Sequence, residues 1–337
     1  MKTNKIIIGK RELNSRLMLA PMAGITDTVL RSMVRQMDKE CLLVTEMLSS
    51  EALVNNPHAK ILESSEFESP LAFQLSGHKP HLMAKAAKIL EQRADFIDIN
   101  MGCPVKKVVC GGDGSALMKT PQIASDIVKA IKDNVEKPVT VKFRLGWTFD
   151  TKNFVEFGKL MEEAGADAIT IHARTRSQMY ADKADWAEIS KLVKEVNIPV
   201  YANGDIVSIE SALECLKLSN ADGLAIGRGA LGNPYIFKQL EHYFETGEIL
   251  PEQTFKEKIE TLKSHLDWEI EHRGEENGIK FFRKFYPYYV RCVRGGSAYR
   301  GKLVTEDNYQ TIITLLDELI EVFENEQKIL HVHSING

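Results

Sequence analysis

Short apolar runs rich in β-branched residues alternate along the chain with longer segments whose apolar positions recur every three or four residues. Most of these runs end in or beside Gly, Asn or Ser, which is typical of a strand leaving a buried sheet. We identify eight such strands, at residues 17–24, 42–47, 71–77, 96–102, 139–146, 168–175, 198–205 and 223–229. Because neighbouring parallel strands need long crossover connections, this alternation predicts a parallel sheet covered by helices.

The number of strand–helix units predicts an α/β fold of the closed (β/α)8 TIM-barrel type, followed by a small C-terminal helical domain. A doubly wound sheet is the alternative, but it favours a GxGxxG fingerprint that APMAGITD (20–27) lacks. NPYIFKQLEHYFETG reads as the last barrel helix, and residues 254–330 show helical periodicity alone. We therefore expect a barrel over residues 1–250 and a helical domain over residues 251–337.

Bulk composition indicates a soluble globular protein, with 44% hydrophobic and 27% charged residues. No apolar run approaches the ~20 residues of a membrane span, and MKTNKIIIGKREL does not resemble a signal peptide. The five cysteines, at positions 41, 103, 110, 215 and 292, form no CxxC pair. We expect a reducing cytoplasm, no disulfide framework and no metal site.

The net charge of −4 argues mildly against a nucleic-acid partner, but the charge is unevenly distributed. Residues 279–304 contain seven basic residues and no acidic one. Aromatic residues interleave with them, namely Phe281, Phe282, Phe285, Tyr286, Tyr288, Tyr289 and Tyr299. Some of these aromatic rings must form core, but the basic face predicts contact with RNA phosphates through Arg283, Lys284, Arg291 and Arg294.

Hydrogen-bonding or charged groups end nearly every predicted strand. The residues at these ends are Met22, Glu46, Gln74, Asn100, Cys103, Lys142, Arg144, His172, Arg174, Asn203, Asp205 and Arg228. Any one of them alone is more simply an ordinary loop residue. In a TIM barrel, however, the carboxyl ends of the strands together form the active face, so their convergence predicts a catalytic site. Cys103 sits at a strand exit, whereas a cysteine used for packing belongs inside the apolar run.

The last two strands suit a phosphate, because ANGDI (202–206) and IGRGALGNP (226–234) place glycines at their ends beside Arg228. Tight turns alone are the alternative explanation for these glycines. Lys142 and Arg144 are two residues apart, so in a strand both side chains point to the same face. Two cations held together favour an anionic, electron-rich partner, such as a phosphate-bearing cofactor with a reducible ring.

Further motifs follow in order along residues 10–245: APMAGITD, TEM, FQLSG, DINMGCPVKKV, GSALMKTP, VTVKFRLGW, TIHARTR, YANGDI and IGRGALGNPYIF. In this combination they resemble the signatures of the tRNA-dihydrouridine synthase family, most nearly its bacterial B-type branch. The helical tail resembles the family's RNA-binding domain more loosely. Residues 1–250 would then be an FMN-binding catalytic barrel, and residues 251–337 an RNA-binding domain.

The resemblance implies an FMN enzyme that uses NADPH, or NADH, to reduce a uridine in folded RNA, with tRNA as the expected substrate. The residues implied at the cofactor are Pro21, Met22, Ala23, Gln74, Lys142, His172, Asn203, Gly204, Asp205, Gly227 and Arg228. The residues implied at the target base are Asn100, Arg144 and Arg174. Neither a protein partner nor a membrane is implied.

The resemblance also implies a role for Cys103. Hydride delivered to C6 of the uracil leaves a need for a proton at C5, and a thiol, largely protonated at neutral pH, supplies it. The VVCGGDG loop departs from the family pattern, and its Cys110 is a competing thiol. Other interpretations remain: the same reaction on ribosomal RNA, a flavin dehydrogenase of free pyrimidines such as dihydroorotate, or an RNA-binding protein built on an inactive barrel.

Overall fold

The computed structural model describes residues 5–58, 62–291, 293 and 295–335, and the chain divides into two compact units. The first unit comprises residues 1–229 and 236–247, and the second comprises residues 230–235 and 248–337. The short segment 230–235 thus belongs to the second unit, although the sequence pattern assigns it to the barrel.

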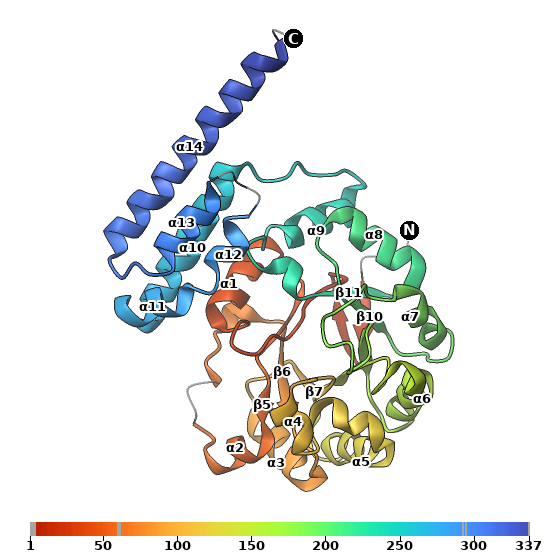
Figure 1. Ribbon diagram of the computed structural model, residues 1–337. Coiled ribbons are helices and arrows are strands. Elements are labelled where there is room, and N and C mark those ends of the chain that lie inside the picture. The colour runs from red at the N-terminus through yellow and green to blue at the C-terminus, as the bar shows by residue number, and fades with distance from the viewer. Residues whose placement is uncertain (1–4, 59–61, 292, 294, 336–337) are drawn as a thin grey trace. The chain divides into compact units, whose positions relative to one another are not determined.

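A closed barrel of parallel strands forms the first unit (Figure 1). Within the described residues its strands are β3 (Leu17–Leu19), β4 (Leu42–Val44), β6 (Leu71–Ser76), β7 (Phe96–Met101), β8 (Val139–Arg144), β9 (Ala168–His172), β10 (Val200–Asn203) and β11 (Gly223–Ile226). Each strand pairs with the next, and β11 returns to pair with β3. A two-residue strand, β5 (Leu48–Ser49), adds to β6. The predicted (β/α)8 fold is therefore confirmed.

Helices surround this barrel (Figure 1). They are α1 (Thr28–Met37), α2 (Ser50–Asn55), α3 (Pro80–Leu90), α4 (Lys106–Cys110), α5 (Pro121–Lys132), α6 (Phe154–Glu163), α7 (Trp186–Val193), α8 (Ile209–Ser219) and α9 (Ile236–Thr246). The last of them, α9, contacts both α1 and α8, so the outer ring closes where the sheet closes.

A short antiparallel hairpin precedes the barrel and was not predicted. Its strands are β1 (Ile6–Ile8) and β2 (Arg11–Leu13), joined at Gly9 with φ +60°. Ile6, Ile8 and Leu13 are buried in one cluster with Leu42 and Phe96, which begin β4 and β7. The hairpin therefore fills the end of the barrel where the strands begin, and the opposite mouth carries the polar strand ends.

The second unit is helical, as expected for the C-terminal part of the chain. Its helices are α10 (Phe255–Arg273), α11 (Glu275–Phe282), α12 (Tyr286–Tyr289), α13 (Gly296–Leu303) and α14 (Tyr309–Ile335). Phe282, Phe285 and Tyr289 are buried around the ring of His265, and Tyr286 is buried against Phe282. More than half of the interleaved aromatic residues are therefore core. None of the described helices is both long and apolar enough to cross a membrane.

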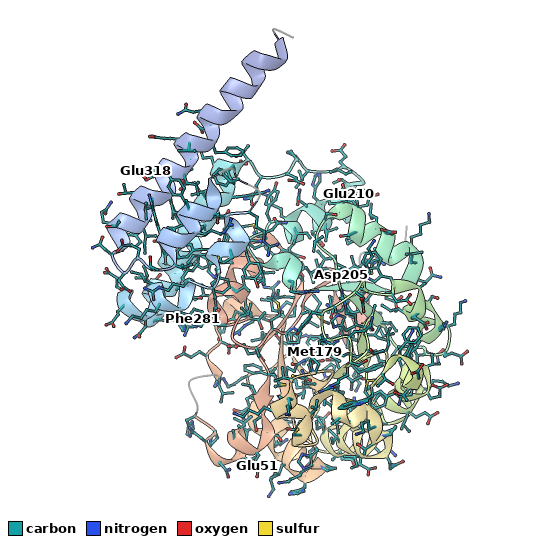
Figure 2. All side chains as sticks on the ribbon, in the orientation of Figure 1. Glu51, Met179, Asp205, Glu210, Phe281 and Glu318 are labelled. Atoms are coloured by element: carbon teal, nitrogen blue, oxygen red, sulfur yellow. The ribbon has the colours of Figure 1, made fainter. Side chains whose placement is uncertain are left out.

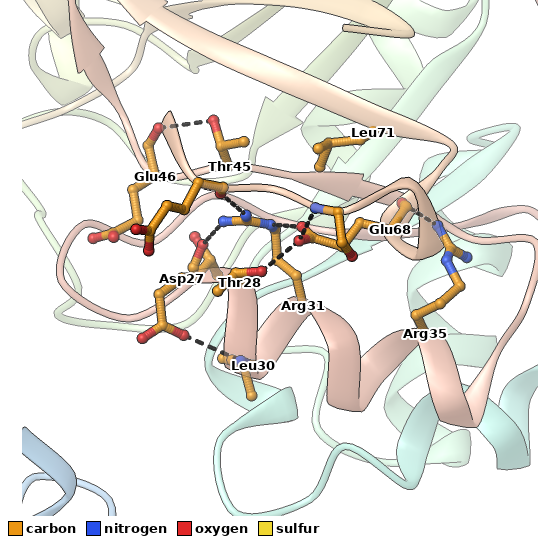
Figure 3. Close-up of polar contacts among 12 residues, drawn as sticks. Asp27, Thr28, Leu30, Arg31, Arg35, Thr45, Glu46, Glu68 and Leu71 are labelled. Carbon is orange, nitrogen blue, oxygen red and sulfur yellow. Dashed lines mark hydrogen bonds and ion pairs between the residues drawn. The ribbon is translucent and has the colours of Figure 1, made fainter. Parts of the chain in front are cut away.

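A buried ion pair fixes the connection that leads into β6. Arg31 on α1 donates to the carboxylate of Glu68, and both side chains are at most 3% exposed (Figure 3). The same guanidinium also donates to the carbonyl oxygens of Thr26 and Glu63. Arg35, one turn along α1, donates to the carbonyl of Glu68. Because Thr26 lies in the loop that follows β3, Arg31 and Glu68 together hold that loop next to the segment that leads into β6.

We expect Glu68→Ala to lower the free energy of unfolding by about 3–5 kcal/mol, because it leaves the Arg31 charge buried without its carboxylate. Glu195→Ala is the control: it breaks the Lys159–Glu195 pair, whose side chains are 46% and 49% exposed. That control should cost no more than about 1 kcal/mol. Urea unfolding of both variants measures the difference, and equal costs would show that the buried pair is not structural.

Candidate active site

The predicted site residues all lie at the mouth formed by the carboxyl ends of the strands. Gln74, Asn100, Lys142, Arg144, His172 and Asn203 belong to the strands themselves, and Pro21–Ala23, Cys103, Arg174, Gly204, Asp205, Gly227 and Arg228 follow directly after strands. Figure 2 labels Asp205, after β10, and Met179, in the loop after β9. Seven neighbouring strands thus contribute to one ring of polar groups.

The loops after β10 and β11 form a cradle with the features of an anion site. Among the described residues, the backbone N–H groups of Gly204, Asp205 and Gly227 have no protein acceptor. Arg228 is exposed beside them, and its Nη2 donates to the carboxylate of Asp205 over 3.1 Å. A side chain on Gly204 would meet the His172 ring 3.1 Å away, so the close backbone approach requires glycine. The residues present therefore fit a phosphate group.

The side chain of Asp205, a residue that the family resemblance implies at the cofactor phosphate, is engaged within the protein. Its carboxylate accepts from Arg174, from Arg228 and from the backbone N–H of Ala184. Burial alone would raise the pKa of Asp205, but the bonds from Arg174 and Ala184 hold that pKa below its usual range. An ionised carboxylate repels a phosphate, so its side chain orients Arg228 and leaves only its backbone N–H for an anion.

Lys142 is the cation at the centre of the ring. Its Nζ donates to the Oδ1 of Asn203 over 3.0 Å, while Asn203 donates in turn to the carbonyl of Ala225. Burial, and then repulsion from Arg144, lower the pKa of Lys142 to about 8. The ammonium is therefore mostly charged at pH 7 and loses its charge just above that pH.

His172 is a neutral imidazole. Burial, followed by the nearby charges of Arg144 and Lys142, lowers its pKa well below the ordinary value. The Nη1 of Arg174 lies 3.3 Å from Nε2 of His172. Because a guanidinium can only donate, Nε2 must accept and Nδ1 carries the proton. His172 can thus form hydrogen bonds in this site, but it carries no titratable proton to donate near neutral pH.

Arg144 and Arg174 hold the loop after β9, which changes what they can do. Arg174 uses Nε on the carbonyl of Ala181, and Nη2 on the carbonyl of Asp182 and on Asp205. With these donors engaged and the side chain 2% exposed, Arg174 holds this loop in place, and its expected contact with a base stays a prediction. Arg144 donates to the carbonyls of Gly102, Thr175 and Met179 and keeps its Nη2 without a protein acceptor among the described residues.

Tyr180 is a site residue that the sequence reasoning missed. Its ring is 53% exposed, and the guanidinium carbons of Arg144 and Arg228 lie 5.5 and 5.0 Å from its centre. The ring of His172 is 6.3 Å away. An exposed aromatic ring between two cations at a barrel mouth is a stacking surface. The available signal was its position in HARTRSQMY, eight residues after His172 in the same motif.

Cys103 is anchored through its backbone on both sides. Its N–H donates to the Oδ1 of Asn100 over 2.9 Å, and its carbonyl accepts from the N–H and Oγ of Ser115 over 3.0 and 2.9 Å. The thiol is free and half-buried at the mouth. This anchoring sets the position of the sulfur independently of side-chain packing.

Cys110 lies in a different environment. It ends α4, is exposed and has no bond to the residues of the ring. The loop that follows is fixed instead by Asp113, whose carboxylate lies 2.7 Å from Nδ1 of His78. The glycine-rich loop after Cys110 is therefore held in place, and Cys110 itself remains exposed at the end of α4.

In the second unit, acidic neighbours neutralise part of the predicted basic face. Lys280 pairs with Glu276 over 2.5 Å, and Arg283 pairs with Asp307 over 2.7 Å, so Arg283 is a poor phosphate contact. Three other cations of this face lie over half-buried aromatic rings: Lys284 over Phe281, Arg291 over Tyr288 and Lys302 over Tyr299. Arg294 and Cys292 lie outside the described residues.

Two solved structures resemble this chain in fold. An old yellow enzyme homologue from Zymomonas mobilis superposes with a TM-score of 0.50 at 14% identity, over 77% of this chain and 95% of that chain. A 2-naphthoyl-CoA reductase superposes with a TM-score of 0.54 at 12% identity, over 71% of this chain and 51% of that chain. At these identities the likeness shows the fold and no more.

Sequence relatives are much closer. A probable tRNA-dihydrouridine synthase 1 from Synechocystis is 39% identical over 93% of this chain and 88% of its own length. The tRNA-dihydrouridine synthase B of Pseudomonas putida is 39% identical over 88% of each chain. The profile described as "Dihydrouridine synthase (Dus)" matches residues 18–324. The resemblance predicted from the motifs is confirmed, and the chain belongs to the dihydrouridine synthase family.

Proposed function

We propose that this protein is an FMN-dependent tRNA-dihydrouridine synthase that reduces the C5–C6 double bond of a uridine with NADPH. The observation that carries the proposal is Cys103, anchored at both its N–H and its carbonyl at the mouth of the barrel. The relatives are named for tRNA, which favours tRNA over ribosomal RNA and over free pyrimidines. A cytoplasmic location, where tRNA is modified, follows from the same proposal.

The cofactor would lie across the ring of polar strand ends. The cradle of Asn203, Gly204, Gly227 and Arg228 would hold its phosphate through backbone N–H groups and one guanidinium. Pro21, Met22 and Ala23 are half-buried or exposed after β3 and would line the ring system. Lys142 would place its positive charge beside the pyrimidine edge, and Gln74 would reach the same edge. Bound FMN would supply the hydride, taken from NADPH, that adds to C6 of the uracil.

The protein's own residues would position the base and provide the proton. The uracil gains a hydride at C6 and a proton at C5, and the Cys103 thiol would give that proton and regain one from solvent. His172, being neutral, would bind the base through hydrogen bonds without competing as an acid. Asn100, the Nη2 of Arg144 and the ring of Tyr180 would hold the base in the mouth.

The second unit would hold the RNA. Lys284, Arg291 and Lys302 combine a cation with an aromatic ring, an arrangement that suits phosphate contact and base stacking.

The direct test of the whole proposal is incubation of the purified protein with unmodified tRNA and NADPH, followed by mass spectrometry of the nucleosides. Activity on free uracil or orotate, with none on tRNA, would favour a pyrimidine dehydrogenase instead.

We expect FMN affinity to fall as pH rises from 7 to 9, because the Lys142 ammonium loses its charge above a pKa of about 8. Below that pH the affinity should be constant, and above it the dissociation constant should rise by up to about tenfold per pH unit. Lys142→Met should bind more weakly and without this pH dependence. Lys152→Met, which removes a cation paired with Glu188, is the control. A colourless protein that does not bind FMN in titration would contradict the cofactor assignment.

We expect Cys103→Ala to retain FMN and its reduction by NADPH, since neither requires the thiol. Dihydrouridine formation should fall by roughly 10²–10⁴, the loss typical of removing a positioned general acid. Cys110→Ala is the matched control and should keep nearly full activity, because Cys110 is exposed at the end of α4. The opposite pattern, with activity lost only in Cys110→Ala, would assign the proton to the VVCGGDG loop.

We expect the combined substitutions Lys284→Glu, Arg291→Glu and Lys302→Glu to weaken tRNA binding and to flatten its salt dependence. Each lost phosphate contact should reduce the slope of log affinity against log salt by about one, because fewer counterions are released. FMN content should not change. Lys280→Glu is the control, since Lys280 already pairs with Glu276. Filter binding from 50 to 300 mM salt measures both quantities, and an unchanged slope would mean that the RNA binds elsewhere.

A further inference from the structure

A buried carboxylate lies beneath the site and takes no part in the proposed reaction. Asp98, in the middle of β7, is 3% exposed. Its register partners are Gln74 on β6 and Thr140 on β8, so the three residues share one level of the barrel. Two residues further along β7, on the same face of the strand, is Asn100. A charge buried at this depth is costly unless its bonds serve a purpose.

The hydrogen bonds from these residues run in one direction. The N–H of Cys103 donates to Oδ1 of Asn100 over 2.9 Å, and Nδ2 of Asn100 donates to Oε1 of Gln74 over 2.8 Å. Nε2 of Gln74 then donates to Oδ2 of Asp98 over 2.6 Å. Thr140 donates to the other oxygen of Asp98 over 2.5 Å. Every donor in this chain of bonds points towards Asp98, where the chain ends.

The two ends of this chain of bonds cannot be reversed: the backbone N–H groups of Gly102 and Cys103 only donate, and Asp98 at the other end is a carboxylate. An amide presents a donor on one side and an acceptor on the other, so Gln74 and Asn100 alone could face either way. An ionised carboxylate only accepts. Burial raises the pKa of Asp98 to about 6, against the bonds from Thr140 and Gln74, so the group is ionised at pH 8. The ionised Asp98 therefore requires Gln74 to direct its NH₂ towards the carboxylate, so that the side-chain oxygen of Gln74 faces Asn100. Asn100 then directs its own NH₂ towards Gln74 and its side-chain oxygen towards the N–H of Cys103.

We propose that Asp98 is a positioning residue for the proton donor, acting through Gln74 and Asn100 to hold the backbone N–H of Cys103. This inference rests on the proposed role of Cys103. Reversal of the two amides would turn the NH₂ of Asn100 towards the N–H groups of Gly102 and Cys103, which both need an acceptor. The turn that carries the thiol would then lose its N–H anchors and keep the bonds to its carbonyls, from Ser115 to Cys103 and from Arg144 to Gly102.

The test is Asp98→Asn, which keeps the shape of the side chain but lets it donate as well as accept. Loss of one charge-assisted hydrogen bond predicts about a 10- to 100-fold lower turnover of tRNA at pH 8. The KM for tRNA, the FMN content and the reduction by NADPH should be unchanged. Asp38→Asn is the matched control, because Asp38 is also a 3% exposed carboxylate but bonds only outside the site.

A second measurement needs no turnover. The rate of alkylation of Cys103 by iodoacetamide, followed by tryptic peptide mapping, reports the environment of the thiol directly. Lys106 and Lys107 separate Cys103 from Cys110 into different peptides. In Asp98→Asn the rate at Cys103 should rise severalfold, while the rate at Cys110 stays at the wild-type value. If Asp98→Asn does not fold, Gln74→Leu cuts the same chain and must give the same rise.

The double variant Asp98→Asn, Cys103→Ala separates this inference from its alternatives. If Asp98 acts through Cys103, the double variant should turn over tRNA no more slowly than Cys103→Ala alone. A further loss in the double variant, or slower reduction by NADPH, would mean that Asp98 acts on the cofactor and would overturn the inference. Unchanged alkylation and turnover in Asp98→Asn would overturn it as well. Full activity of Cys103→Ala would instead refute the proposed function itself.

Discussion

Closure of a parallel sheet is the constraint on which the rest of this structure depends. A closed parallel barrel has no edge, so every strand must present its carboxyl end at the same mouth. The hairpin residues Ile6, Ile8 and Leu13 fill the opposite end. Polar groups at the strand ends therefore have only one place to gather. Residues more than two hundred positions apart, such as Met22 and Gly227, become neighbours for this reason alone.

This crowding sets the electrostatics of the site. Lys142, Arg144 and Arg174 are all largely buried near one another, and their mutual repulsion contributes to the low pKa values of Lys142 and His172. Asp205 compensates for part of this charge through its bonds to two arginines. The mouth remains a place where an anion is favourable. A phosphate-bearing cofactor would offset this excess of positive charge, whereas a neutral ligand would not.

Backbone anchoring, rather than side-chain packing, fixes the geometry of the mouth. Arg144 joins the loop after β9 to the turn at Gly102, and Arg174 holds the same loop from beneath. Asn100 and Ser115 hold the peptide groups of Cys103. Several residues with the chemistry to bind substrate thus serve to place others.

The sequence by itself determined the barrel, the strands that form it and the residues at their ends. Periodicity reports which positions are buried, and strand exits follow from it, so Lys142, His172 and Cys103 were predictable without coordinates. It could not reveal the three-residue strands of the hairpin, because so short a run has no periodicity. It also missed Tyr180, whose loop has no regular pattern.

Only the tertiary structure decided which polar groups are engaged with each other. Arg174 and Arg228 look alike in sequence, yet one has its donors on carbonyls and the other is exposed beside the glycines of the cradle. Arg283 is expected to contact RNA phosphates, but it pairs with Asp307, which lies twenty-four residues further along the chain. The sequence likewise does not show the direction of the hydrogen bonds that run from Cys103 to Asp98. Hydrogen-bond partners depend on distances across strands and loops, and no local pattern encodes them.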